Sequence, residues 1–232
     1  MSAVRTARER ARAELTTEIT ALARQHVAES GAAALSLRAV ARELGMVSSA
    51  LYRYFPSRDE LLTTLIIDSY RALAARMRTA DTGAGPRERW TAVCHALRDW
   101  AIAHPHEYAL IYGTPVPGYR APADTVQPAA EVYLALLTVV RDAATAGSLV
   151  EADLPVDLGP ELAEQLTAVQ DGLADGVPLA VLARLFQAFG QLVGAISLEL
   201  FGHFVGTVDP AGPLYQLTVA ELADRLGLVG SR

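Results

Sequence analysis

The stretch that decides the fold is residues 34–62, ALSLRAVARELGMVSSALYRYFPSRDELL. Its first part has the apolar spacing of a helix, with Ser36 placed to cap the start and Gly45 placed to end it in the left-handed conformation. A tight turn then leads into a second short helix over residues 48–54, which Pro56 stops. Two short helices joined by a glycine-containing turn predict a helix-turn-helix.

A longer helix is expected on each side of this pair. Residues 5–30 repeat apolar side chains every three or four positions, and Ser57 with Glu60 forms a capping box that starts the next helix. Gly and Pro clusters punctuate the rest of the chain, and the alternation of β-branched residues typical of strands is absent. We therefore expect an all-α fold with an N-terminal three-helix helix-turn-helix domain, residues 1–60, and a larger helical domain, residues 61–232.

The overall composition indicates a folded cytoplasmic protein. Hydrophobic residues make up 51% of the 232 residues, and the mean hydropathy is +0.22, which is enough for a sizeable core. Cys94 is the single cysteine, so no internal disulfide can form and no oxidising compartment is indicated. No stretch reaches the roughly 18 uncharged apolar residues of a membrane span, so we expect no membrane partner.

The charge is unevenly distributed along the chain. The net charge is −6, but residues 1–60 hold nine Arg against seven Asp or Glu, and the remainder holds eleven Arg against nineteen. The positive charge concentrates near the start, where four arginines face only Glu9. This cluster suits a phosphate backbone or is an ordinary solvated helix start, and the sequence leaves both open. The four arginines are Arg5, Arg8, Arg10 and Arg12.

In a helix-turn-helix the second helix enters the major groove of DNA, which is about 12 Å wide. If Leu51 and Phe55 point to the core, the polar positions between them point outward and offer hydroxyl and guanidinium groups to phosphates and base edges. The alternative is an ordinary helical hairpin with a polar surface. The outward positions are Ser48, Ser49, Tyr52 and Arg53.

The same run resembles the signature of the TetR family of bacterial transcriptional regulators. The shared order is a helix with Arg and Ala, a Gly, a short helix ending in Leu-Tyr-x-x-Phe, and a helix start of the Ser-Lys-x-x-Leu type. The resemblance covers roughly the first quarter of the chain. It implies nine or so helices, a homodimer and a palindromic double-stranded DNA operator.

The resemblance also assigns positions near the phosphates. Ser36 and Arg38 fall on the helix that positions the motif, and Tyr52 and Tyr54 fall where family members often contact the DNA backbone. Arg58 stands at the usual lysine position beside the next helix start, which keeps the charge for a phosphate contact.

The base-reading positions of the family correspond here to Ser48 and Ser49. Two departures blur the assignment of side chains to bases. Val47 stands where the family commonly has a Ser or Thr cap, so the helix starts differently or uses Ser48 as its cap. Tyr54 replaces a frequent His.

The larger domain is expected to bind a small, mostly apolar effector. Residues 87–104 form an amphipathic pattern, and the following HPHEYALIY resembles the C-terminal domain of a TetR subgroup. Side chains with an apolar body and a polar tip suit an apolar pocket with a few orienting hydrogen bonds, although core packing explains them equally well. The candidate effector residues are Trp100, His104, Tyr108, Tyr112 and Tyr133.

Three histidines raise the question of a metal site. Asp99 follows His95 by four residues, but Pro105 holds His104 and His106 in an extended or turn conformation, and no second close pair of ligands occurs. We expect no metal and no cofactor.

The expected dimer interface lies near the C-terminus. Residues 178–206 indicate one long helix with an apolar surface too wide for an ordinary exterior helix, and its glycines recur in steps of four or eight. A dimer seam is the first interpretation of this ridge, space for a ligand the second, and tight packing within one subunit the third. A final helix over residues 213–226 would complete a four-helix bundle with the symmetry mate. The candidate interface residues are Phe186, Phe189, Gly190, Val193, Gly194 and Leu222.

The function that unites these features is a ligand-responsive repressor, a homodimer that the effector releases from its operator. The motifs G-x-S-x-G, HExxH and the glycine-rich nucleotide loops are absent, so we do not expect an enzyme. A helical interaction protein without DNA binding is the other alternative.

Overall fold

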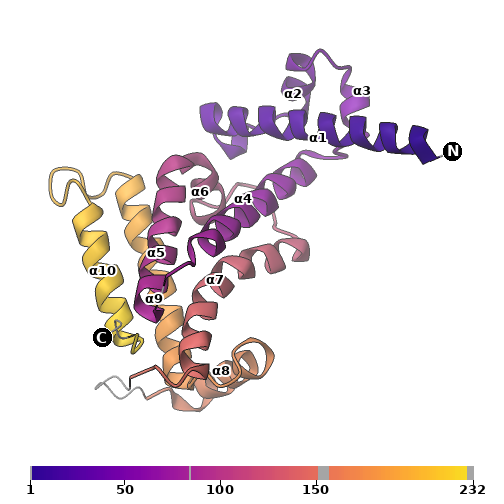
Figure 1. Ribbon diagram of the computed structural model, residues 1–232. Coiled ribbons are helices and arrows are strands. Elements are labelled where there is room, and N and C mark those ends of the chain that lie inside the picture. Colours follow the sequence, from indigo (N-terminus) through magenta and orange to yellow (C-terminus); the bar gives the residue numbers. More distant parts are fainter. Residues whose placement is uncertain (1, 84, 151–156, 229–232) are drawn as a thin grey trace. The chain divides into compact units, whose positions relative to one another are not determined.

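The computed structural model describes residues 2–83, 85–150 and 157–228. Within these ranges the chain is all-α, as predicted, and the single β-type pairing is a bridge between Leu149 and Leu228. Two short 3-10 turns, η1 (Ala32–Ala34) and η2 (Ala123–Thr125), lie between helices. The helices, coloured along the chain in Figure 1, are α1 (Ser2–Ser30), α2 (Leu37–Glu43), α3 (Ser48–Leu51), α4 (Arg58–Ala80), α5 (Pro86–Ala103), α6 (Pro105–Tyr112), α7 (Val126–Thr145), α8 (Gly159–Leu173), α9 (Leu179–Leu200) and α10 (Gly212–Arg225).

The chain forms two compact units. Unit 1 comprises Met1–Tyr70 and His104–Pro128, and unit 2 comprises Arg71–Ala103 and Ala129–Arg232. The helix-turn-helix therefore shares its unit with α6, which lies far from it in the sequence. The predicted division into a helix-turn-helix domain, residues 1–60, and a larger helical domain, residues 61–232, stays a prediction.

The turn between α2 and α3 forms as local chemistry requires. The Ser36 hydroxyl accepts a hydrogen bond from the backbone N–H three residues on, which caps α2. Gly45 has a φ of 67°, and its N–H donates to the Arg42 carbonyl at 3.1 Å. The Met46 N–H donates to the Ala41 carbonyl at 2.8 Å. This pair of bonds is the Schellman motif, which ends a helix at a left-handed glycine.

Residues 48–54, the segment predicted to enter the major groove, are called the recognition segment below. The regular helix in this segment is shorter than predicted. α3 ends at Leu51, and hydrogen-bonded turns continue it, including a bond from the Phe55 N–H to the Leu51 carbonyl at 3.1 Å. Leu51 is fully buried and Phe55 is 6% exposed, so both side chains anchor the segment in the core of unit 1. Buried apolar side chains from three other helices complete that core, among them Ile19, Ala23, Val40, Leu61, Leu62 and Leu65.

Unit 2 is held together by α5, α9 and α10, which contact one another. The indole N–H of Trp90, which is fully buried, donates to the Val219 carbonyl at 3.1 Å. The Tyr215 hydroxyl donates to the Cys94 carbonyl at 2.7 Å. These bonds satisfy buried polar atoms and tie α10 to α5.

α9 is shorter than the predicted helix over residues 178–206. It ends at Leu200 because Gly202 is left-handed, with a φ of 79°, and the His203 N–H bonds to the Leu198 carbonyl. By length and mean hydropathy α9 is the one described helix that could cross a membrane, but core helices of globular proteins pass the same test. Its contacts with α5, α8 and α10 identify it as a packed helix of unit 2.

Candidate functional site

The surface of α3 and the turns after it carries polar side chains on the side opposite Leu51. Ser49 and Arg53 are exposed, and Tyr52 is 41% exposed. Ser48 and Tyr54 are half-buried. The geometry therefore gives the recognition segment an outer face of hydroxyl and guanidinium groups, which can meet phosphates and base edges.

A shallow depression joins the start of α2 to this face. Its volume is about 440 Å³. Polar side chains from three segments gather around it, so four of the residues predicted to bind DNA share one surface. Ser57 also lines the depression, and it was not among the predicted DNA-binding residues. Its hydroxyl next to Arg58 was the available signal. The lining residues are Leu35, Ser36, Leu37, Arg38, Tyr52, Pro56, Ser57 and Arg58.

Arg58 has a structural role that the sequence did not reveal. Its guanidinium donates to the backbone carbonyls of Ala32 at 2.9 Å, Ala33 at 3.1 Å and Leu35 at 3.2 Å. The third guanidinium nitrogen lies 3.5 Å from the Asp59 carboxylate. All three nitrogens are thus engaged, and Arg58 ties η1 and the entry to α2 onto the start of α4.

The start of α3 has no side-chain cap. Val47 occupies the cap position without a side-chain hydrogen bond, so Ser48 begins the helix and does not act as its cap. Val47 is 70% exposed, which places an apolar side chain at the edge of the polar face. The Tyr54 ring, at the other end of the segment, lies 5.1 Å from the guanidinium carbon of Arg12 in α1.

The predicted effector residues fall into both units. His104, Tyr108 and Tyr112 belong to unit 1, while Trp100 and Tyr133 belong to unit 2. In unit 1 the rings of Tyr108 and Tyr112 lie 5.2 Å apart. His104 stands at the cap position of α6 without a side-chain capping bond. Burial raises the pKa of the Tyr112 phenol well above its ordinary value, which keeps that hydroxyl neutral.

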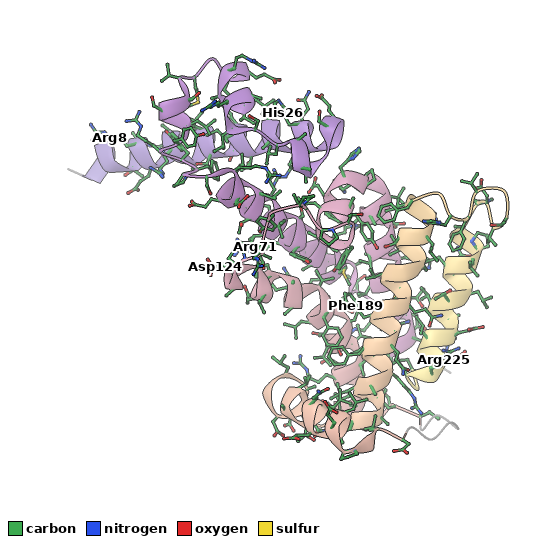
Figure 2. All side chains as sticks on the ribbon, turned by 180° about the vertical axis from the view of Figure 1, so that it is seen from behind. Arg8, His26, Arg71, Asp124, Phe189 and Arg225 are labelled. Atoms are coloured by element: carbon green, nitrogen blue, oxygen red, sulfur yellow. The ribbon has the colours of Figure 1, made fainter. Side chains whose placement is uncertain are left out.

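In unit 2, Tyr133 joins an aromatic cluster. Its ring stacks on Phe186 at 4.6 Å between centroids, and it meets Phe189 edge to face at 5.9 Å. Figure 2 labels Phe189 on α9. Among the described residues, the Tyr133 hydroxyl is a buried polar atom without a hydrogen-bond partner. Burial also raises the pKa of this phenol. Trp100 is 5% exposed and lies in the core.

A separate cavity of about 400 Å³ lies between the end of α4 and α7. Arg78 and Glu131 form an ion pair across it at 3.3 Å, and Asp81 at its edge pairs with Arg89 at 2.6 Å. The cavity contains none of the predicted effector residues. Its lining residues are Arg78, Asp81, Glu131, Leu134, Ala135 and Thr138.

The histidines considered as metal ligands belong to different units. His95 belongs to unit 2, where its ring packs edge-on against Tyr215 at 5.8 Å, whereas His104 and His106 belong to unit 1. Across the described ranges, no three His, Cys, Asp or Glu side chains group as metal ligands could.

The predicted interface residues on α9 face outward from unit 2. Phe186 is 43% exposed, Gly190 is exposed, and Phe189, Val193 and Gly194 are half-buried. A Cβ atom added at Gly190 or Gly194 would meet no atom within 4 Å. Tight packing inside the subunit therefore does not account for these two glycines.

Leu222 differs from the other predicted interface residues. It is 3% exposed and packs inside unit 2, so its side chain stabilises its own subunit and is not available to a second copy. The exposed apolar residue on the same helix is Leu217, at 55%.

Comparisons with known proteins agree with this architecture. Residues 19–65 match the model for bacterial regulatory proteins of the tetR family, and residues 90–222 match the model for a tetracyclin repressor-like C-terminal domain. The HTH-type transcriptional regulator Rv1816 of Mycobacterium tuberculosis is 39% identical over 202 residues, which cover 84% of each chain. The HTH-type transcriptional repressor KstR2 of the same species is 34% identical over 96 residues, which cover 41% of this chain and 48% of the other.

A solved structure supports the same assignment over nearly the whole chain. The crystal structure of SCO4313, a candidate regulatory protein, has a TM-score of 0.76 and 39% identity, covering 92% of this chain and 97% of the other. Two family models match the chain, and the relative Rv1816 is similar over 84% of both chains. The chain therefore belongs to the TetR family and is a DNA-binding transcriptional regulator.

Proposed function

We propose that this regulator is a ligand-responsive repressor, which binds a palindromic operator as a homodimer and leaves it when a small, mostly apolar effector binds. The observation that carries the proposal is the exposed polar face of α3 beside the depression rimmed by Ser36, Arg38 and Tyr52. Such a face suits the major groove and its flanking phosphates. This role requires no catalysis, and it places the protein in the cytoplasm with the chromosome.

The contacts with DNA divide by the position of each side chain. We assign base reading to Ser48, Ser49 and Arg53, which point away from the core on α3 and the turn after it. The groups on the rim of the depression and Tyr54 bind phosphates and fix the register. Because its three nitrogens already hold backbone carbonyls and Asp59, Arg58 acts by positioning α2.

The outer face of α9 is the proposed dimer seam. Gly190 and Gly194 leave room for another backbone, and Phe186, Phe189 and Val193 supply apolar surface beside them. A two-fold symmetric interface uses the same patch from both copies, so one helix face suffices. Such a dimer would present two recognition segments to half-sites about one helical turn (34 to 36 Å) apart.

The effector site is proposed around Tyr133. A buried hydroxyl without a partner costs roughly 1 to 3 kcal/mol, so a ligand that supplies the missing hydrogen bond gains that energy. The aromatic cluster around Tyr133 supplies apolar surface next to this hydroxyl. The other candidates are Trp100, His104, Tyr108 and Tyr112, which remain proposals.

The connections between the units supply a route for the effector to act. The chain passes from one unit to the other after Tyr70, Ala103 and Pro128, and the first crossing lies within the continuous helix α4. A ligand that favours one conformation of unit 2 can thereby change the position of the recognition segment. Repression is the proposed outcome, as the name of the partly similar repressor KstR2 suggests.

A mobility-shift assay with the DNA upstream of the protein's own gene tests the proposal. The wild-type protein should shift this duplex, and the double variant Arg38→Ala with Tyr52→Phe should bind it at least tenfold more weakly while keeping its helical content. Arg71→Ala, which removes an exposed arginine from unit 2, is the matched control and should bind normally. If the folded wild-type protein does not bind DNA duplexes at low salt, the result contradicts the proposal and favours a helical interaction protein without DNA binding.

A further inference from the structure

The N-terminal part of α1 extends beyond the core of unit 1. Every residue from 6 to 14 is exposed, and burial begins only near Ile19. In Figure 1 this end of α1 continues past α3, and Figure 2 labels Arg8 near its tip. A helix extension without core contacts gains little stability from hydrophobic burial, which leaves its charged side chains free to contact a partner.

Two arginines of this extension continue the face by which α1 packs on the helix-turn-helix. Arg8 and Arg12 are four residues apart, and in helical projection they align with Leu15 and Ile19. Leu15 is half-buried against the core cluster, and Ile19 is fully buried in it. The same side of the helix therefore changes from apolar to cationic where the core ends. Arg10 points to the opposite side.

The contact between Arg12 and Tyr54 shows where this cationic face points. The Arg12 guanidinium carbon lies 5.1 Å from the centre of the Tyr54 ring, directly after the recognition helix. Among the described residues, the ion pairs include neither Arg8 nor Arg12. Positive charge that is not held in a described ion pair thus lies beside the face that we propose for DNA.

We propose that the N-terminal end of α1 is a second DNA contact, in which Arg8 and Arg12 bind phosphates that flank the half-site occupied by α3. The inference rests on the proposed function, because it assigns a further contact to the same complex. The partner is the DNA backbone, since closely spaced guanidinium groups on one helix face match successive phosphates in charge and geometry. These contacts add affinity without sequence preference.

The test compares Arg8→Gln/Arg12→Gln with the control Arg10→Gln/Arg71→Gln. Both pairs remove two exposed positive charges, but the control pair lies off the proposed face. Operator affinity is measured against salt concentration on a duplex that ends at the outer half-site edges and on one with about ten further base pairs on each side. Circular dichroism checks that the helical content of each variant is kept.

On the longer duplex, the slope of log affinity against log salt should become shallower by about 0.9 for each phosphate that the variant no longer neutralises, and affinity should fall severalfold. The control pair should leave both unchanged, and on the short duplex the variants should match the wild type. Equal slopes for the variant and the wild type on the longer duplex would overturn the inference and identify the extension as a solvated helix end. An equal decrease on both duplexes, or an equal decrease in the control, would also overturn it. A wild-type protein that binds neither duplex would contradict the proposed function itself, so the two failures are distinguishable.

Discussion

The two units collect their candidate functional residues over very different distances along the chain. In unit 1 all eight predicted DNA-binding residues lie between Ser36 and Arg58, and two turns with local hydrogen bonds place them. In unit 2 the aromatic cluster brings Tyr133 against Phe186, which comes from another helix. Local turn chemistry therefore shapes most of the first site, whereas packing between distant helices determines the second.

The largest expected effect tests whether burial of α3 holds the first site in place. Leu51→Ala removes a fully buried side chain, so the free energy of unfolding of unit 1 should fall by about 3 kcal/mol. Urea unfolding followed by circular dichroism measures the change. Val47→Ala, in a residue that is 70% exposed, should stay within about 0.5 kcal/mol of the wild type. Equal effects of the two substitutions would contradict the placement of Leu51.

The next effect tests the long-range hydrogen bonds that Arg58 makes within unit 1. Arg58→Ala removes three charge-assisted bonds to backbone carbonyls of η1 and Leu35, and it should destabilise unit 1 by about 2 kcal/mol. Arg58→Lys should restore less than half of this stability, because an ammonium group cannot reproduce the planar fork. The exposed Arg53→Ala should leave stability unchanged. Full rescue by lysine would show that charge, and not the bonding geometry, is what matters at this position.

The smallest expected change in stability belongs to unit 2. Tyr133→Phe removes a buried hydroxyl without a partner, so the melting temperature of the ligand-free protein should stay constant or rise, equivalent to at most about 1 kcal/mol. Tyr215→Phe is the matched control, and it should lose about 1 kcal/mol because its hydroxyl donates to the Cys94 carbonyl. A destabilised Tyr133→Phe would mean that the hydroxyl has a partner, and the effector proposal would lose its main support.

The sequence predicted the DNA-binding site better than the aromatic cluster, for the same reason. The cap at Ser36, the helix end at Gly45 and the inward positions of Leu51 and Phe55 depend on residues a few positions apart, so spacing alone predicted them. The tie from Arg58 to η1 was missed because it spans more than twenty residues and depends on how α4 packs.

In unit 2 the sequence predicted apolar faces but not what covers them. The spacing of Leu222 suited an interface, yet its own subunit buries it, while Leu217 on the same helix is exposed. The aromatic residues suited a pocket, but periodicity did not indicate that they divide between the two units. The end of α9 at Leu200 depended on Gly202 being left-handed, which the apolar pattern concealed.

The central claim is that two copies of the exposed recognition segment meet two half-sites, and a hydroxyl-radical footprint on the DNA upstream of the gene tests it most directly. The account predicts two protected half-sites related by dyad symmetry, with centres about one helical turn apart. If folded protein protects no position of this duplex, the result would contradict the account.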